Sequence, residues 1–162
     1  ATLYSSCNLP ISQRFMQLNK FTDYALRILM YISKPKDTPY TIAEIATNLH
    51  VSQNHLVKIV HFMGKQNWIV TIRGKGGGIH LHTDAYSLHL GDLVRTLQGH
   101  PPIVDCYSPP CVFRSNCGLI SILNQAAEAF YQHLNQYTFA DLSPPSTAQL
   151  RNLNIPILNI SG

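Results

Sequence analysis

Three cysteines lie close together in the chain, and their thiols are the side chains best suited to chemistry. Cys106, Cys111 and Cys117 fall within twelve of the 162 residues, and prolines at 101, 102, 109 and 110 interrupt regular helix there. Three thiolates can converge on one soft metal centre, whereas zinc or an iron–sulfur cluster normally takes four protein ligands. The sequence therefore predicts a metal site with one position left for another ligand or for an attacking small molecule.

The fourth ligand of such a site is open. His100 lies six residues before Cys106, and with it the three cysteines would form a zinc site. If no metal binds, Cys106 and Cys111 could pair as a disulfide, which would make this stretch a thiol redox switch. The fourth cysteine of the chain, Cys7, is isolated and is not expected to be a ligand.

The positive charge of the chain is unevenly distributed. There are 12 Lys and Arg against 8 Asp and Glu, and residues 42–81 contain four basic residues and a single acid, Glu44. Such a stretch favours a polyanionic partner such as nucleic acid. No apolar run approaches the roughly 18 residues of a membrane span, and the start lacks the pattern of a signal peptide. We therefore expect a cytoplasmic protein.

The residue pattern does not favour an enzyme. No nucleophile is set beside a base with an orienting acid. The glycine run 76–78 is not followed by Lys and Ser or Thr, so it lacks the pattern of a phosphate-binding loop. The glycines are instead expected to serve a tight turn.

Apolar periodicity predicts a mostly α-helical chain with one small β-hairpin. Ser52 is suited to cap the third predicted helix, Thr22 or Asp23 the first, and Gly91 or Asp92 the fourth. The tip of the hairpin, residues 73–78, is rich in glycine and basic residues. Helices are predicted at 21–32, 42–49, 53–66, 91–97 and 119–137, and strands at 68–72 and 79–82.

Two helices joined by a short turn and followed by a basic hairpin have the layout of a winged helix-turn-helix. The helix from residue 53 would enter the major groove, where Gln and Asn pair with adenine and Lys reaches guanine or phosphate. The hairpin tip would contact phosphates, which position a protein without specifying sequence. The residues expected to contact DNA are Ser52, Gln53, Asn54, His55, Lys58, Arg73 and Lys75.

Three separated motifs resemble the family of iron–sulfur winged-helix regulators that includes the NsrR and IscR proteins. They are MQLNKFTDYALR at 16–27, VSQNHLVKI at 51–59 and RGKGGGI at 73–79. The cysteine spacing is also similar, with four residues between the first pair and five between the second. The resemblance covers residues 16 to about 142, which is most of the chain.

The resemblance implies a homodimeric repressor of nitrosative-stress genes that binds a double-stranded DNA operator while an iron–sulfur cluster is intact. Nitric oxide then attacks the cluster, and DNA is released. In this family the fourth ligand can be an aspartate from the first helix of the partner subunit, which corresponds by position to Asp23. Three cysteines and one oxygen favour [4Fe–4S], with [2Fe–2S] as the alternative. The competing function is an iron–sulfur, zinc or thiol redox regulator of a different regulon.

Asp23 has two other roles open to it, because it is spaced to pair with Arg27 and could cap its helix. The expected fold class is mostly α with a small β-hairpin, comprising a winged helix-turn-helix domain and a long C-terminal dimerisation helix. The expected boundaries are a disordered leader at 1–15 with Met16 as a candidate native start, the DNA-binding domain at 16–99, a cluster-binding loop at 100–118, the dimerisation helix at 119–142 and a flexible tail at 143–162.

Overall fold

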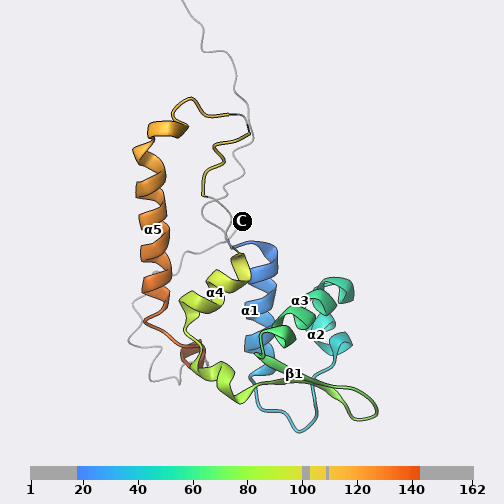
Figure 1. The fold of residues 1–162 in the computed structure, drawn as a ribbon. Helices are drawn as coiled ribbons and strands as arrows, with labels where there is room; N and C mark the ends of the chain where they lie inside the picture. Colours follow the sequence, from blue (N-terminus) through green and yellow to red (C-terminus); the bar gives the residue numbers. More distant parts are fainter. Residues whose placement is uncertain (1–17, 100–102, 109, 143–162) are drawn as a thin grey trace, which may run out of the picture.

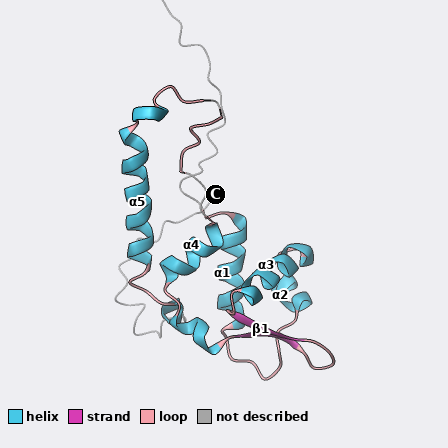
Figure 2. Ribbon diagram, in the orientation of Figure 1, coloured by secondary structure: helices cyan, strands magenta, loops and turns pink. Residues whose placement is uncertain are grey.

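The computed structural model describes residues 18–99, 103–108 and 110–142 (Figure 1). The predictions for the leader at 1–15 and the tail at 143–162 lie outside this part. The described chain is mostly helical with one antiparallel β-hairpin (Figure 2). Its elements are α1 Lys20–Ile32, α2 Ile42–Leu49, α3 Gln53–Lys65, β1 Ile69–Ile72, β2 Gly78–Leu81, η1 Thr83–Ser87, α4 Leu90–Gln98, η2 Arg114–Asn116, α5 Gly118–Leu134 and η3 Phe139–Leu142, where η marks a 3₁₀ helix.

The core forms where α1, α2 and α3 pack with the hairpin and α4. Ile28 of α1, Ile45 of α2 and Leu56 of α3 are fully buried, and Leu93 of α4 is 2% exposed. Within α1 and α3 the buried side chains recur at three- and four-residue spacing, which is why each helix presents one apolar stripe to its neighbours. This arrangement of helices and hairpin is the predicted winged helix-turn-helix.

The start of α3 agrees with the predicted cap at Ser52, and the start of α1 differs from its prediction; α2, for which no cap was predicted, begins in the same way as α3. The Thr41 and Ser52 hydroxyls accept hydrogen bonds from the amides of Glu44 and His55. In α1 the cap is Asn19, whose Oδ1 accepts from Thr22 N at 2.8 Å, so the predicted cap at Thr22 or Asp23 is wrong. Thr22 is fully buried, and its hydroxyl is used in a contact with another helix.

The wing is a short, regular hairpin. Ile69 pairs with Leu81 and Ile72 with Gly78, and an isolated bridge from Tyr40 to Ile79 joins the hairpin to the chain ahead of α2. At the tip, Gly74 and Gly76 have φ values of 100° and 79°, a region that glycine adopts without steric cost. The glycine-rich tip therefore serves a tight turn, as predicted.

The start of α4 is fixed by α5 instead of by a capping side chain. His89 is the N-cap and makes no side-chain capping bond, so the predicted cap at Gly91 or Asp92 is wrong. The Asp92 amide donates to Asn135 Oδ1 at 2.9 Å, and Asn135 Nδ2 donates back to Asp92 Oδ1 at 3.0 Å. Asp92 therefore serves the contact between the two helices.

Helix α5 lies beside α4 along its C-terminal half and extends beyond it, away from α1, α2 and α3 (Figure 1). It ends at Leu134, three residues earlier than predicted, and the chain then turns so that Phe139 in η3 is buried against the core. No residue of α5 is buried. Within the described residues, no helix is both long and apolar enough to cross a membrane.

Candidate functional site

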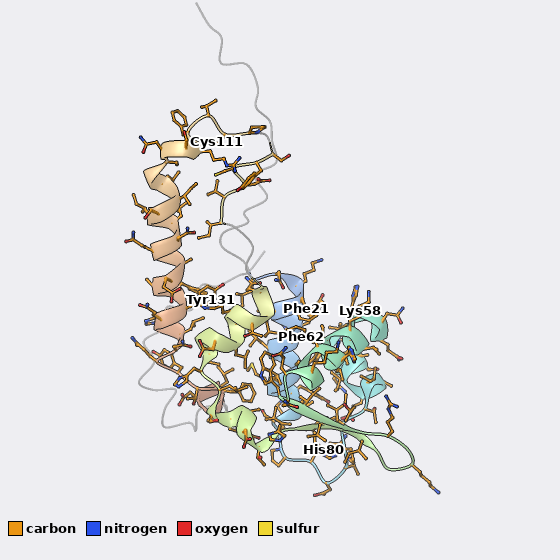
Figure 3. The ribbon with its side chains drawn as sticks, viewed as in Figure 1. Phe21, Lys58, Phe62, His80, Cys111 and Tyr131 are labelled. Carbon is orange, nitrogen blue, oxygen red and sulfur yellow. The ribbon has the colours of Figure 1, made fainter. Side chains whose placement is uncertain are left out.

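Helix α3 presents a polar face to the exterior. Its apolar residues Leu56, Ile59 and Met63 are buried, which leaves the opposite side free. Figure 3 shows Lys58 on the outer side of α3, facing away from the core. The exposed polar residues at the start and on the outer side of the helix are Ser52, Gln53, Asn54, His55, Lys58, His61 and Lys65. This face combines amide groups, imidazoles and lysines, the groups that read base edges and phosphates.

Two further predicted residues lie on the wing. Arg73 and Lys75 are exposed on either side of Gly74 at its tip. The wing extends to one side of α3 (Figure 1). All seven residues predicted to contact DNA are therefore exposed, with five at the start of one helix and two on the adjacent hairpin tip.

Residues 42–81, which include α3 and the wing, are net positive, and their single acid, Glu44, is paired with a lysine from outside this stretch. Glu44 accepts hydrogen bonds from Lys36 Nζ at 2.6 and 2.7 Å and from the Tyr31 hydroxyl at 3.3 Å. The hydrogen bond from Lys36 is the main reason that the pKa of Glu44 lies below its ordinary value. No other carboxylate occurs in residues 42–81. The basic side chains of this stretch are Lys58, Lys65, Arg73 and Lys75.

The three cysteines lie in what we call the cysteine segment, residues 103–108 and 110–117, at the N-terminal end of α5 (Figure 3). Cys106 is buried, whereas Cys111 and Cys117 are partly exposed and all three are free thiols. The Cys111 amide donates to the Cys106 carbonyl at 3.2 Å, so the first two cysteines stand at the ends of one closed turn. Cys117 is the N-cap of α5 and makes no side-chain capping bond.

The donor set suits a soft, negatively charged metal group. Cysteine thiolates are the usual ligands of iron–sulfur clusters, and the amides at a helix start favour a negative group next to them. Arg114, whose guanidinium lies 3.9 Å from the Tyr107 ring centre, adds positive charge between the second and third cysteines. Among the residues that the structure describes, however, no three His, Cys, Asp or Glu side chains are gathered closely enough to hold a metal.

Asp23 lies in the first turn of α1, away from the cysteine segment of the same chain. Its Oδ1 accepts from Arg27 Nε at 2.7 Å, so the predicted pairing within the helix is present. The two side chains are 39% and 59% exposed, which leaves the carboxylate accessible to another molecule. His100, the competing ligand, and Cys7 lie outside the described residues.

The contacts that join these regions leave no signal in the sequence pattern. Gln98 at the end of α4 accepts a hydrogen bond from the Thr22 hydroxyl in the first turn of α1. Arg95 Nη2 in α4 donates to both carboxylate oxygens of Glu128 in α5, each at 2.8 Å. The paired residues are 76 and 33 positions apart. No local spacing rule connects residues at such separations, so only the fold could identify them.

Comparison with known proteins agrees with this architecture. The family model of Rrf2, described as iron-dependent transcriptional regulators, matches residues 18–145. The HTH-type transcriptional regulator NsrR of Oceanobacillus iheyensis is 39% identical over 131 residues, covering 78% of this chain and 89% of the relative. The Bacillus subtilis regulator of the same name is 36% identical over 131 residues, covering 78% and 90%.

The solved structures give the same fold. A transcriptional regulator from Lactobacillus plantarum superposes with a TM-score of 0.64 at 20% identity, covering 82% of this chain and 90% of that one. The resemblance seen in three sequence motifs thus extends over the described chain and is confirmed by sequence relatives and fold. The chain belongs to the Rrf2 family of transcriptional regulators.

Proposed function

We propose that this chain is a homodimeric repressor that binds operator DNA through α3 and the wing, and that senses nitric oxide through an iron–sulfur cluster at the cysteine segment. The observation that carries the DNA-binding part is the exposure of all seven predicted contact residues on one helix and the adjacent wing. The sensing part is supported by the three free thiols and by the relatives named NsrR. The genes it would control are those of nitrosative stress.

On DNA, the residues divide by what they can reach. Gln53, Asn54 and Lys58 would contact base edges in the major groove, because they lie at the exposed start of α3. Arg73 and Lys75 would contact phosphates through the wing. Lys58→Ala should therefore relax sequence discrimination. Lys75→Ala should weaken binding to all sequences and reduce the slope of the log binding constant against log salt concentration by about 1.

These two effects are measured on a duplex enriched by the wild-type chain from a random pool. Lys34→Ala is the matched control, since Lys34 lies in the loop between α1 and α2, on the other side of the hairpin from α3 (Figure 1). Equal losses of sequence discrimination for Lys34→Ala and Lys58→Ala would contradict the assignment of the exposed face of α3 to base contacts.

At the cysteine segment, Cys106, Cys111 and Cys117 would hold the cluster, and Asp23 of the first helix of a partner subunit would be the fourth ligand. The bound cluster would supply iron that nitric oxide can attack. We favour [4Fe–4S] over [2Fe–2S] because three thiolates and one oxygen suit it. The partial exposure of Asp23 supports its role, since a carboxylate shared between subunits must be accessible.

Two measurements separate this function from its alternatives. Anaerobically purified protein should be coloured and contain iron and sulfide, whereas colourless protein with one zinc per chain would favour a zinc site. A metal-free protein whose mass shows a Cys106–Cys111 disulfide after peroxide would favour a thiol switch. The turn closed between these two residues is the observation that favours this second candidate.

Asp23 is tested separately. Asp23→Ala should assemble a cluster that reacts with nitric oxide at an altered rate in stopped-flow absorbance. Asp37→Ala, at an exposed position in the loop between α1 and α2, is the control. A rate equal to that of the wild type would remove Asp23 from the mechanism.

The dimer is proposed from α5. Leu119 and Ile122 are 55% and 64% exposed, and large contiguous apolar surfaces on a soluble chain mark interaction sites. Val112 and Phe113 of the cysteine segment are also exposed next to the start of α5. Burying this surface in a second copy would place the two cysteine segments and both reading helices in one two-fold assembly, which suits paired half-sites.

A further inference from the structure

One side chain at the end of α4 fastens the first turn of α1. Gln98 Oε1 accepts two hydrogen bonds, from the Asn19 amide at 3.0 Å and from the Thr22 hydroxyl at 2.9 Å. The partners are 79 and 76 residues away along the chain. We call these three residues the clasp.

The clasp is built into the core on one side. Thr22 is fully buried, and its hydroxyl donates to Gln98. Asn19 is at once a clasp residue and the N-cap of α1, since its own Oδ1 accepts from the Thr22 amide. Loss of the Gln98 oxygen would leave a buried hydroxyl without its acceptor, which is costly unless the first turn of α1 moves.

The same turn of α1 contacts the reading helix. The ring of Phe21 meets the ring of Phe62 in α3 edge to face, with centroids 5.3 Å apart and planes at 89° (Figure 3). Phe62 lies one turn along α3 from Lys58, on the same helix. A displacement of the first turn of α1 would therefore shift α3 through the contact between these two rings.

The other side of the clasp leads to the cysteine segment. Gln98 is the last residue of α4, Gly99 follows with φ 69°, and Cys106 comes eight residues after Gln98 in the sequence. Helix α4 is also held to α5 by the Asp92–Asn135 and Arg95–Glu128 bonds. The position of the C-terminal end of α4 therefore depends on α5, the helix that follows the cysteine segment.

We propose that Gln98 is a positioning residue that ties the first turn of α1 to the end of α4, so that a change in the cysteine segment reaches α3 through Phe21 and Phe62. This rests on the proposed function, in which the state of the cysteine segment controls DNA binding. The turn held by the clasp also carries Asp23. The clasp therefore places the carboxylate and the aromatic contact together.

Two substitutions separate the hydrogen bonds from simple packing. Gln98→Met keeps the length and apolar stem of the side chain but removes the acceptor, whereas Gln98→Glu keeps an acceptor for both donors. Ile32→Val, in the last turn of α1 and remote from the clasp, controls for a general loss of stability. Each full-length variant is first checked for cooperative unfolding.

The first readout is structural and uses metal-free protein. In Gln98→Met, amide hydrogen exchange at Asn19, Thr22 and Asp23 should accelerate on the order of tenfold, while exchange in Gln98→Glu and Ile32→Val stays near wild type. Unchanged exchange at these three amides in Gln98→Met would overturn the clasp.

The second readout is the ratio of DNA affinities of iron-loaded and metal-free protein for a duplex enriched by the wild type. Gln98→Met should reduce this ratio by about fivefold or more, and Gln98→Glu should retain it. An equal loss of affinity in both forms, leaving the ratio unchanged, would show a purely structural role and overturn the proposal. If the wild type itself shows no difference between the two forms, the proposed function fails as well, which distinguishes the two failures.

Discussion

The winged helix-turn-helix and the region containing the cysteine segment and α5 are held together in different ways. The first has a continuous core in which Ile28, Ile45 and Leu56 are fully buried. In the second, Cys106 is the one buried residue among those described, and α5 has none. A region without a core of its own depends on a metal group, a second subunit or both for a fixed geometry. The proposed sensing chemistry thus lies in the region that has the fewer buried contacts of its own.

The largest contrast should appear when one leucine is shortened in each region. Leu56→Ala should lower the free energy of unfolding by about 2–5 kcal/mol, because it leaves a cavity in the core. Leu119→Ala, at a side chain 55% exposed, should change it by less than about 0.5 kcal/mol in the monomer. Urea unfolding at low protein concentration measures both. Equal losses would remove the distinction between the two regions.

The junction between α4 and α5 can be tested by a pair of glycine substitutions. A Cβ on Gly91 would overlap the Tyr131 carbonyl and the Asn135 side chain, so Gly91→Ala should destabilise by about 1–3 kcal/mol. Gly64, in α3, has nothing within 4 Å of an added Cβ, so Gly64→Ala should stabilise by about 0.5–1 kcal/mol through helix propensity. The change in Tm on thermal unfolding gives the sign of the stability change for each variant. A stabilising Gly91→Ala would mean that α5 does not pack against α4 in solution.

The exposed stripe of α5 should matter for association more than for folding. Ile122→Glu should raise the dimer dissociation constant at least about tenfold, since it places a charge in an apolar interface, and should change the stability of the monomer little. Analytical ultracentrifugation over a range of concentrations checks this. Gln125→Glu, an exposed polar position on the same helix, is the control and should leave the dimer intact. A dimer unaffected by Ile122→Glu would move the interface elsewhere.

The smallest effect concerns Glu44 in α2. The pKa of Glu44 is lowered, chiefly by the Lys36 hydrogen bond, so the folded state holds fewer protons than the unfolded state near the ordinary value of 4.5. The stabilisation is therefore present above that pH and is lost as the pH falls through the lower folded-state pKa. Between about pH 5 and about pH 3, the Tm of the wild type should fall more steeply than that of Glu44→Gln. Lys36→Met should flatten the same slope, and a steeper slope in either variant would contradict the ion pair.

The sequence predicted the elements well and their contacts poorly, for a physical reason. Helix α2 and the start of α3 follow from local apolar spacing and from capping residues adjacent to them in the chain. The predicted N-cap of α1 at Thr22 or Asp23 is wrong. Asn19 caps the helix, and the Thr22 hydroxyl instead donates to Gln98 in α4. Contacts between residues 43 to 79 positions apart depend on the packed fold and leave no periodic signal.

The site divides in the same way. The exposed residues at the start of α3 were predicted because helical spacing alone separates its outer and inner faces. The spacing of the three cysteines indicates a site, whereas under the proposed function their approach to Asp23 would depend on a second subunit and a bound group. These are properties of an assembly, which one sequence does not encode in local pattern.

In the proposed function, the state of the cysteine segment controls DNA binding by α3 and the wing. It is tested most directly by fluorescence anisotropy of a labelled duplex, enriched by the wild-type chain, during anaerobic titration of the iron-loaded protein with nitric oxide. We expect the affinity to fall at least about tenfold as nitric oxide is added, and a Cys106→Ser variant to lose this response. Affinity that is unchanged by nitric oxide in iron-loaded wild-type protein would contradict it.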